Sequence, residues 1–250
     1  MSFFLGYLNK IDFKKKRRYI RLINRFRTFF KTKDLNFLAV VYKTDKWGKH
    51  FYTQHYKFHF SSFRKKKINL LEIGIGGYEN PLQGGGSLRM WERFFPNATI
   101  YGLDIFDKKL LAEGRINIIQ GSQVDRALLE NLSEKVGGFD IIIDDGSHQN
   151  HHIIETFQIL FPLLKMGGIY VVEDTQTSYW EEYGGDELNP DNPDTAVAFF
   201  KSLIHGLNYS EMKNTNRPKF PYEEVISSIH FYHNLIFIYK GKNPFNATNK

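Results

Sequence analysis

Short apolar runs alternate with amphipathic stretches from residue 68 onward. The apolar runs predict strands, and the amphipathic stretches predict helices: strands at 68–77, 99–106, 116–122, 139–146 and 169–175, and helices at 87–95, 126–136 and 151–164. Gly167-Gly168 is expected to end the third of these helices. Strands that alternate with helices are typical of a parallel sheet with helices on both faces.

The end of the chain breaks this alternation. Residues 224–241 predict two strands joined at His233-Asn234, which would form an antiparallel hairpin at one edge. The predicted fold is therefore α/β and Rossmann-like, with a mostly parallel sheet of seven strands and an antiparallel C-terminal hairpin.

The N-terminal segment differs from the rest in charge. The chain has 34 basic and 27 acidic residues. Residues 1–33 contain 11 of the basic residues and one of the acidic residues, so the rest of the chain carries a net charge of −3. Between Phe13 and Phe30 a basic helix is predicted, with Ile20, Ile23 and Phe26 as apolar anchors. Such a helix could lie on an anionic membrane surface, or it could cover the domain or pack on a second subunit. Because the basic charge is confined to this segment, general nucleic-acid binding is less favoured than either.

Composition narrows the function classes further. With 250 residues and 42% hydrophobic residues, the chain is expected to divide into a helical cap at 1–63 and a main domain at 64–250. The sequence has no cysteine, which excludes disulfides and thiolate chemistry. No apolar run approaches the ~18 residues of a membrane span. In MSFFLGYLNK the apolar residues precede the basic one, unlike a secretory signal, so a cytoplasmic location is expected.

Glycines and acids follow the predicted strands, where ligands bind in such sheets. The first strand runs into Glu72-Ile73-Gly74-Ile75-Gly76-Gly77, but Glu79 stands where a dinucleotide fingerprint needs glycine. An acid beside these glycines suits an ammonium group better than a pyrophosphate. Asp104, after the second strand, suits ribose hydroxyls. Ammonium and ribose without pyrophosphate together describe S-adenosylmethionine.

Carboxylates and a histidine follow the fourth and fifth strands. Asp144-Asp145-Gly146-Ser147-His148 ends the fourth, and Glu173-Asp174 ends the fifth. Crowded carboxylates repel one another unless a proton or cation intervenes, and oxygen ligands at a partly open site favour Mg²⁺ or a similar ion such as Mn²⁺. His148 lies at the entry to a helix that Ser147 is expected to cap, and it is suited to take a proton from a nearby hydroxyl.

Three segments carry a resemblance to a known family. GIGGYENPLQGGGSLRMWERFFPNATIYGLDIFDK, IDDGSHQNHH and YVVEDTQTSYW resemble the metal-dependent sugar O-methyltransferases of the class I S-adenosylmethionine-dependent superfamily, known for methylating deoxysugars of macrolide antibiotics. TDKWGKHFYTQHYKFHF also resembles the segment before their cofactor domain, so the similarity runs from about Thr44 to Trp180. No counterpart of the large N-terminal domain of the macrolide enzymes is expected, since a basic helix and a short cap stand in its place.

The resemblance implies specific roles for the strand-end residues. The metal ligands it implies are Asp145, Glu173 and Asp174, and His148 is the implied catalytic base, acting with Asp145. The cofactor positions expected from the resemblance and from the strand ends are Glu72, Gly74, Gly76, Asp104, Ser122 and Asp144. Tyr179, Trp180 and Gln176 are candidate substrate contacts, and the roles of Lys46, Trp47, His50 and Tyr52 stay open between a lid and a substrate contact.

The expected reaction is attack of a sugar hydroxyl on the sulfonium methyl group. Lys, Asn, Ile, Phe and Tyr are abundant, as expected from an AT-rich genome, whereas the genomes of macrolide producers are GC-rich. The expected substrate is therefore a nucleotide-linked heptose or hexose for capsule or other surface polysaccharide. The alternatives are a macrolide sugar or other natural product, a catechol-type diol, an RNA, or a non-catalytic membrane-binding module. A homodimer is also expected.

Overall fold

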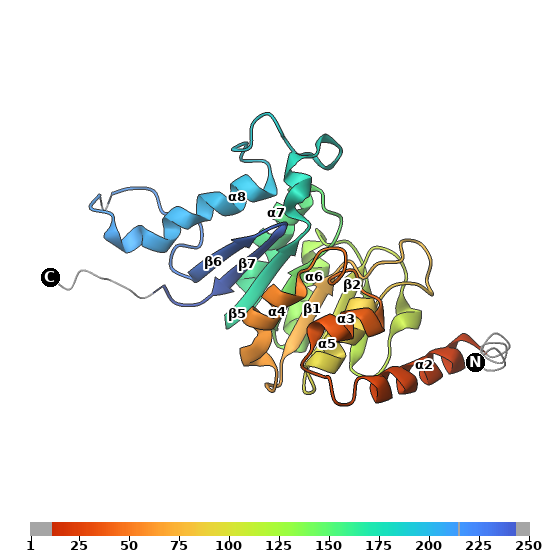
Figure 1. Cartoon of the computed structure of the whole chain (residues 1–250). Coiled ribbons are helices and arrows are strands. Elements are labelled where there is room, and N and C mark those ends of the chain that lie inside the picture. Colours follow the sequence, from red (N-terminus) through yellow and green to blue (C-terminus); the bar gives the residue numbers. More distant parts are fainter. Residues whose placement is uncertain (1–11, 215, 244–250) are drawn as a thin grey trace.

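A computed structural model describes residues 12–214 and 216–243, and its centre is one twisted sheet (Figure 1). The strand order is β3-β2-β1-β4-β5-β7-β6. The strands are β1 (Asn69–Ile73), β2 (Thr99–Asp104), β3 (Ile116–Gln120), β4 (Phe139–Asp144), β5 (Leu164–Glu173), β6 (Ile226–Tyr232) and β7 (Leu235–Lys240). The first five are mutually parallel, and β7 pairs antiparallel with both β5 and β6. The predicted seven-stranded Rossmann-like sheet with its C-terminal hairpin is confirmed, and Asn234 takes a left-handed conformation (φ +58°) in the hairpin turn.

The order of the strands reverses between β1 and β4. Strands β2 and β3 lie on one side of β1, and β4 and β5 lie on the other. At such a reversal the loops after the two central strands separate and leave a crevice at their carboxyl ends. The glycine-rich turn after β1 and the Asp145–His148 loop after β4 therefore face the same space.

The helices that flank the sheet agree with those predicted from the sequence, except at the C-terminal end of α7. They are α5 (Gly86–Phe94), α6 (Arg126–Val136), capped by Asp125, and α7 (Asn150–Leu163). Helix α7 does not continue to Gly167-Gly168, because Leu164 is already extended and pairs with Phe139. The two glycines instead lie in an irregular part of β5 between Leu164 and Ile169, where a Cβ on Gly168 would lie 2.9 Å from the Asp140 carbonyl oxygen. The prediction that Ser147 caps this helix is also wrong, because Gln149 is the residue that directly precedes α7.

From residue 12 onward, three helices precede the sheet: α2 (Phe13–Arg27), α3 (Leu35–Tyr42) and α4 (Thr53–Phe60). A 3₁₀ turn, η1 (Ser61–Phe63), follows them. Side chains of α3 and α4 share one buried cluster with α5 and with one face of β1, β4, β5 and β7. The division proposed at 63/64 stays a prediction, but it falls within this continuous core.

Helix α2 turns its polar face toward the domain. Arg17 and Arg21 form ion pairs with Glu113 and Glu92 at 2.5 and 2.7 Å, and Thr28, in the turn after the helix, is fully buried. The opposite face, which carries Phe26, is exposed. The predicted helix is confirmed, but its amphipathicity is inverted relative to an ordinary surface helix.

The remaining elements cover the other face of the sheet and the strand ends. Helix α8 (Ala196–Ser202) packs on α7, and 3₁₀ turns lie at η2 (Lys109–Leu111), η3 (Thr175–Tyr179), η4 (Glu181–Tyr183) and η5 (Leu203–Glu211). None of the helices in residues 12–214 and 216–243 combines the length and hydrophobicity needed to cross a bilayer.

Candidate functional site

Three carboxylates project from neighbouring strands on the same face of the sheet. Side chains alternate between the two faces of a strand, so Glu72 on β1, Asp145 just after β4 and Glu173 on β5 all lie on the face covered by α3, α4 and α5. Because β4 pairs with both β1 and β5, the three acids lie side by side at the carboxyl ends. This alternation explains why acids far apart in the sequence meet.

A lysine from the segment between α3 and α4 lies among these acids. The Lys46 Nζ is 2.5 Å from Glu173 Oε1, 3.1 Å from Asp145 Oδ2 and 3.2 Å from Glu72 Oε1, and its side chain is 1% exposed. Burial by itself would lower the pKa of Lys46, but the three carboxylates outweigh it and hold that pKa well above its usual range. Lys46 is therefore a fixed positive charge that offsets the repulsion between the acids.

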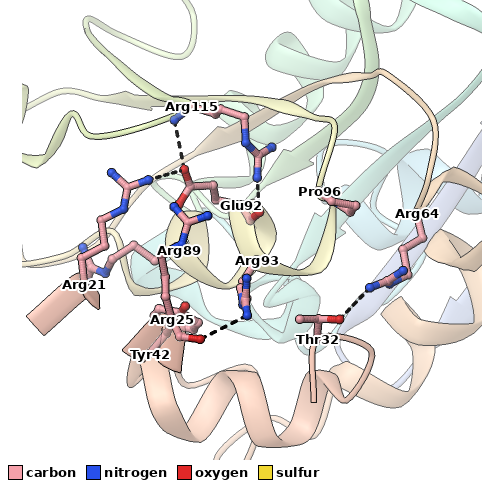
Figure 2. Close-up of a pocket in the computed structure, with 10 residues that line it drawn as sticks. All are labelled: Arg21, Arg25, Thr32, Tyr42, Arg64, Arg89, Glu92, Arg93, Pro96 and Arg115. Carbon is pink, nitrogen blue, oxygen red and sulfur yellow. Dashed lines mark hydrogen bonds and ion pairs between the residues drawn. The ribbon is translucent and has the colours of Figure 1, made fainter. Parts of the chain in front are cut away.

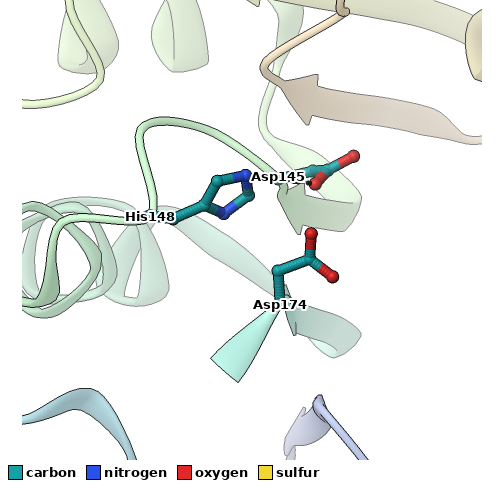
Figure 3. Close-up of side chains that lie close together, drawn as sticks. All are labelled: Asp145, His148 and Asp174. Carbon is teal, nitrogen blue, oxygen red and sulfur yellow. Dashed lines mark ion pairs between the residues drawn. The ribbon is translucent and has the colours of Figure 1, made fainter. Parts of the chain in front are cut away.

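Asp145, His148 and Asp174 form a second cluster, which faces the crevice (Figure 3). One donor atom from each lies within 4.8 Å of the others, and the His148 Nε2 is 3.9 Å from Asp145 Oδ1. His148 and Asp174 both adopt left-handed conformations (φ +59° and +55°), which are uncommon for residues other than glycine. Strain of this kind gathers at functional sites, where it fixes the direction of a side chain.

The two aspartates of this cluster each use one carboxylate oxygen to bind the N-terminal segment. Asp145 Oδ2 accepts from Lys46 Nζ, and Asp174 Oδ1 accepts from the Tyr52 hydroxyl at 2.7 Å. Burial, followed by the hydrogen bond to Asp174, raises the pKa of Tyr52, so this hydroxyl remains a donor. The other oxygens, Asp145 Oδ1 and Asp174 Oδ2, are left for a ligand. Carboxylate oxygens and an imidazole nitrogen at this spacing fit a divalent cation.

Glu173, the third predicted metal ligand, is not brought into this cluster. Its Oε1 accepts hydrogen bonds from Lys46 Nζ and from the Tyr56 hydroxyl, and its side chain is buried. Glu173 therefore lies outside the group of donor atoms that are within 4.8 Å of one another.

The crevice beside the cluster has a volume of about 850 Å³. This is within the range of small-molecule sites, which is about 300–1,000 Å³. Four of the predicted cofactor residues line it: Gly74, Gly76, Asp104 and Ser122. A Cβ on Gly74 (φ +75°) would lie 2.0 Å from the Asp145 carbonyl oxygen, so this glycine lets the loops after β1 and β4 touch.

Asp104 is held in place by the backbone of the glycine-rich turn. Its Oδ2 accepts from the Ile75 N–H at 3.1 Å, and its Oδ1 accepts from the Phe106 N–H at 2.9 Å. A carboxylate accepts about four hydrogen bonds, so Asp104 retains acceptor capacity toward the crevice. Nearly buried and fixed in this way, it is suited to hold a pair of neighbouring hydroxyls.

Two other predicted cofactor residues do not face the crevice. Glu72 is fully buried, its Oε2 accepts from the Trp91 indole at 3.1 Å, and it is not among the residues that line the crevice. Its expected contact with the ammonium group of a cofactor stays a prediction. Asp144 points to the opposite face of the sheet, where Gln123 and Tyr170 donate to it. Burial raises the pKa of Asp144 to about 7. Strand alternation is the reason in both cases, since a residue at a strand end points into one layer of the fold rather than along the strand.

Only two of the three candidate substrate residues lie at the crevice. Gln176 and Trp180 line the crevice, whereas Tyr179 is exposed outside its lining. The Oε1 of Gln176 is buried without a hydrogen-bond partner among the described residues, which marks an acceptor available to a ligand.

The sequence interpretation missed several residues at the site. His152 lines the crevice and lies 2.8 Å from the Ser147 hydroxyl, and Gln123 joins Asp144 to the Ser147 N–H. Lys46 and Tyr52 were noticed in the TDKWGKHFYTQHY segment, but no local pattern assigned them partners. The polar residues just after the third strand were a usable signal for Gln123.

Several known proteins are similar to this chain in sequence or structure. A model of the rhamnosyl O-methyltransferase/CmcI family matches residues 100–219. The chain is 46% identical to the demethylmacrocin O-methyltransferase of Streptomyces fradiae, over 84% of this chain and 54% of that protein. It is 44% identical to the 8-demethyl-8-alpha-L-rhamnosyl tetracenomycin-C 2'-O-methyltransferase of Streptomyces olivaceus, over 82% and 54%.

A solved structure is similar over the same region. The MycE methyltransferase of the mycinamycin biosynthetic pathway, in complex with Mg, SAH and mycinamycin VI, has a TM-score of 0.80 and 44% identity, covering 84% of this chain and 54% of that one. The chain thus spans about half the length of the relatives it matches. It belongs to the same family as these enzymes, the rhamnosyl O-methyltransferase/CmcI family of class I methyltransferases.

Proposed function

We propose that this protein is an S-adenosylmethionine- and divalent-metal-dependent O-methyltransferase acting on a sugar hydroxyl. The observation that carries the proposal is the position of Asp145, His148 and Asp174 on the same crevice as Gly76 and Asp104. A cation site and a nucleoside-sized site in one space fit a transfer between a cofactor and a metal-held hydroxyl.

The cofactor would lie along the glycine-rich turn. Gly74 and Gly76 allow the backbone to approach a ligand closely, and Asp104 would accept hydrogen bonds from the ribose hydroxyls. The buried Glu72 would act indirectly, by holding Lys46 and Trp91 beneath the turn.

The cation would lie between Asp145 and Asp174. When bound, Mg²⁺ or Mn²⁺ orients neighbouring sugar oxygens and lowers the pKa of a hydroxyl. Lys46 and Tyr52 each hold one oxygen of these carboxylates and so fix the direction of the other. His148 would accept the hydroxyl proton, and Gln176 and Trp180 would contact the sugar, since all three line the crevice.

The relatives indicate a narrower class of methyl acceptor than the amino-acid composition does. The matched enzymes are named for rhamnosyl tetracenomycin C and demethylmacrocin, and MycE was solved with mycinamycin VI. We therefore prefer a deoxysugar on a natural product to the nucleotide-linked capsule sugar expected from the AT-rich composition, which none of these relatives supports.

The proposal is tested by calorimetry and by a substrate panel. S-adenosylhomocysteine should bind the wild-type protein, and Asp104→Asn should weaken binding by at least tenfold, since hydrogen bonds to a charged group contribute about 1.5–3 kcal/mol. Asp107→Asn, an exposed neighbour, serves as the control. Methyl transfer to rhamnosides but not to catechols would support the sugar assignment. Tight NAD binding without S-adenosylhomocysteine binding would refute the class of enzyme.

A second function is favoured by the exposed face of α2. Leu22, Phe26 and Phe30 are 57%, 84% and 92% exposed, and basic residues flank them, among them Arg18, Arg27 and Lys31. We propose that this face binds the anionic cytoplasmic surface of a membrane, because apolar insertion and basic charge act together there. A second copy is the weaker occupant, since two such helices would place like charges together.

Vesicle co-sedimentation tests the membrane contact. Binding to phosphatidylserine-containing vesicles should fall in a Phe26→Ser/Phe30→Ser variant and with added salt, whereas Leu188→Ser, equally exposed on a distant loop, should bind normally. The expected homodimer is checked by sedimentation of the same variants. A dimer that dissociates only in the double variant, without vesicle binding, would assign the face to a second copy.

A further inference from the structure

A second pocket, distinct from the crevice, lies between α2 and α5 and has a volume of about 140 Å³ (Figure 2). Six arginines line it, from α2, α5 and the segments beside them: Arg21, Arg25, Arg64, Arg89, Arg93 and Arg115. Among the described residues, Glu92 is the only acid in the lining. The pocket is near the starts of β2 and β3, whereas the crevice is at the ends of the strands, and the two linings share no residue.

Most of these guanidinium groups lack a carboxylate partner. Arg21 pairs with Glu92 at 2.7 Å, and Arg89 lies 3.9 Å from Glu113, which Arg17 holds more closely at 2.5 Å. No carboxylate of the described residues lies within ion-pair distance of the other four arginines, Arg25, Arg64, Arg93 and Arg115. The pocket therefore carries a large excess of positive charge.

The guanidinium groups of three of these four arginines donate hydrogen bonds to neutral oxygens, although the backbone N–H of Arg115 donates to the Glu92 carboxylate. Arg93 Nε donates to Thr28 Oγ1 at 2.8 Å. Figure 2 shows that Arg93 also donates to the backbone carbonyl of Arg25, at 3.1 Å, and that Arg64 donates to Thr32 Oγ1, at 2.8 Å. Arg115 donates to the backbone carbonyls of Phe95, Ala98 and Glu92. These contacts hold the side chains in place without neutralising them, and the Nε of Arg64 is buried with no partner among the described residues. Fixed, unneutralised guanidinium groups are what phosphate recognition uses.

Size and hydrogen bonding narrow the ligand class. The pocket is smaller than the about 300 Å³ at which small-molecule sites begin, so it suits a single phosphate group rather than a whole nucleotide. Tyr42 also lines it, and burial raises the pKa of this tyrosine, so its hydroxyl can donate to an anion.

We propose that this arginine-lined pocket binds a phosphate group, either of a lipid headgroup or of a soluble phosphorylated compound. Arg25 and Arg64 lie on opposite elements of its rim and would close on the anion, while Arg93 and Arg115 supply fixed charge. The site is separate from methyl transfer, and it lies beside the helix whose apolar face is exposed.

Calorimetry with inorganic phosphate tests the site directly. The wild-type protein should bind phosphate, and an Arg25→Gln/Arg64→Gln variant should bind it at least about tenfold more weakly, because each lost charge-assisted hydrogen bond contributes about 1.5–3 kcal/mol. Arg126→Gln removes an exposed arginine on α6 and should bind like the wild type. Circular dichroism and S-adenosylhomocysteine binding should be unchanged in both variants, which shows that the fold is intact.

Vesicles distinguish the two sources of phosphate. Binding to phosphatidic acid vesicles that competes with inorganic phosphate and is lost in the double variant would identify a lipid headgroup. Phosphate binding that the vesicles do not affect would identify a soluble ligand. Absence of phosphate binding to the wild type, or equal binding by wild type and double variant, would overturn the proposal.

Discussion

The Lys46 Nζ lies 2.5 Å from Glu173 Oε1, although the two residues are 127 positions apart in the chain. The contact joins the segment between α3 and α4 to the end of β5. It also places one buried cation among three buried or half-buried acids, Glu72, Asp145 and Glu173. The N-terminal helices are therefore tied electrostatically to the site as well as packed on the sheet.

Replacement of this lysine should destabilise the protein strongly. Lys46→Met removes the cation and leaves the carboxylates uncompensated, and breaking a buried ion pair in this way costs about 3–5 kcal/mol. Urea unfolding should show this loss, whereas Lys57→Met, an exposed lysine on α4, should change the free energy of unfolding by less than about 0.5 kcal/mol. Similar stability of the two variants would mean that the acids are protonated and need no cation.

Removal of a proposed metal ligand should abolish the response to Mg²⁺. In the wild type, Mg²⁺ at 100 times its dissociation constant should add about 2.7 kcal/mol to the free energy of unfolding. Asp174→Asn should remove this gain and the activity while leaving S-adenosylhomocysteine binding, because Asp104 and the glycine turn are untouched. Asp191→Asn, exposed and paired with Lys201, is the control. Full activity after exhaustive chelation would refute the metal site.

His148 should be required for turnover but not for cofactor binding. General base catalysis contributes about 10²–10⁴-fold, so His148→Ala should lower kcat by that order. His151→Ala is the matched control, because His151 is exposed on α7 and lies outside the crevice. Single-turnover rates with both variants check the assignment, and a loss confined to His151→Ala would show that the base has been misplaced.

Stability should fall on acidification because of His59. This histidine is buried between the Tyr239 and Tyr232 hydroxyls and stacks on Phe237 at 4.0 Å. Burial, with smaller effects of His230 and His55, lowers its pKa to about 4, compared with about 6.5 in the unfolded chain. The unfolded state therefore binds a proton first, and stability that is present above pH 6.5 is lost as pH falls toward 4, by about 3 kcal/mol.

The pH dependence of unfolding checks this expectation. His59→Gln should be less stable than the wild type at pH 7, but the difference should shrink between pH 6.5 and 4 because glutamine does not titrate. A constant difference across that range would show that His59 does not take up a proton on unfolding.

Local patterns in the sequence were sufficient to predict the strands of the sheet and several of the residues that line the crevice. Apolar runs predicted all seven strands, and the helix at 126–136 was predicted to its ends. Its caps, Asp125 and Gly137, were identified only in the structure. The strand-end rule placed Asp104, Ser122, Asp145 and Asp174 on one crevice, because the carboxyl ends of parallel strands meet at one edge.

The tertiary structure decided what each strand-end side chain touches. Alternation turned Glu72 and Glu173 toward Lys46 and turned Asp144 toward Tyr170, because a side chain must point into one of the two layers beside the sheet. The partner it meets there comes from a distant part of the chain, which no local spacing encodes. The same holds for α2: its sequence predicted an amphipathic helix, but Glu92 and Glu113 on the domain attract its arginines and leave its apolar face exposed.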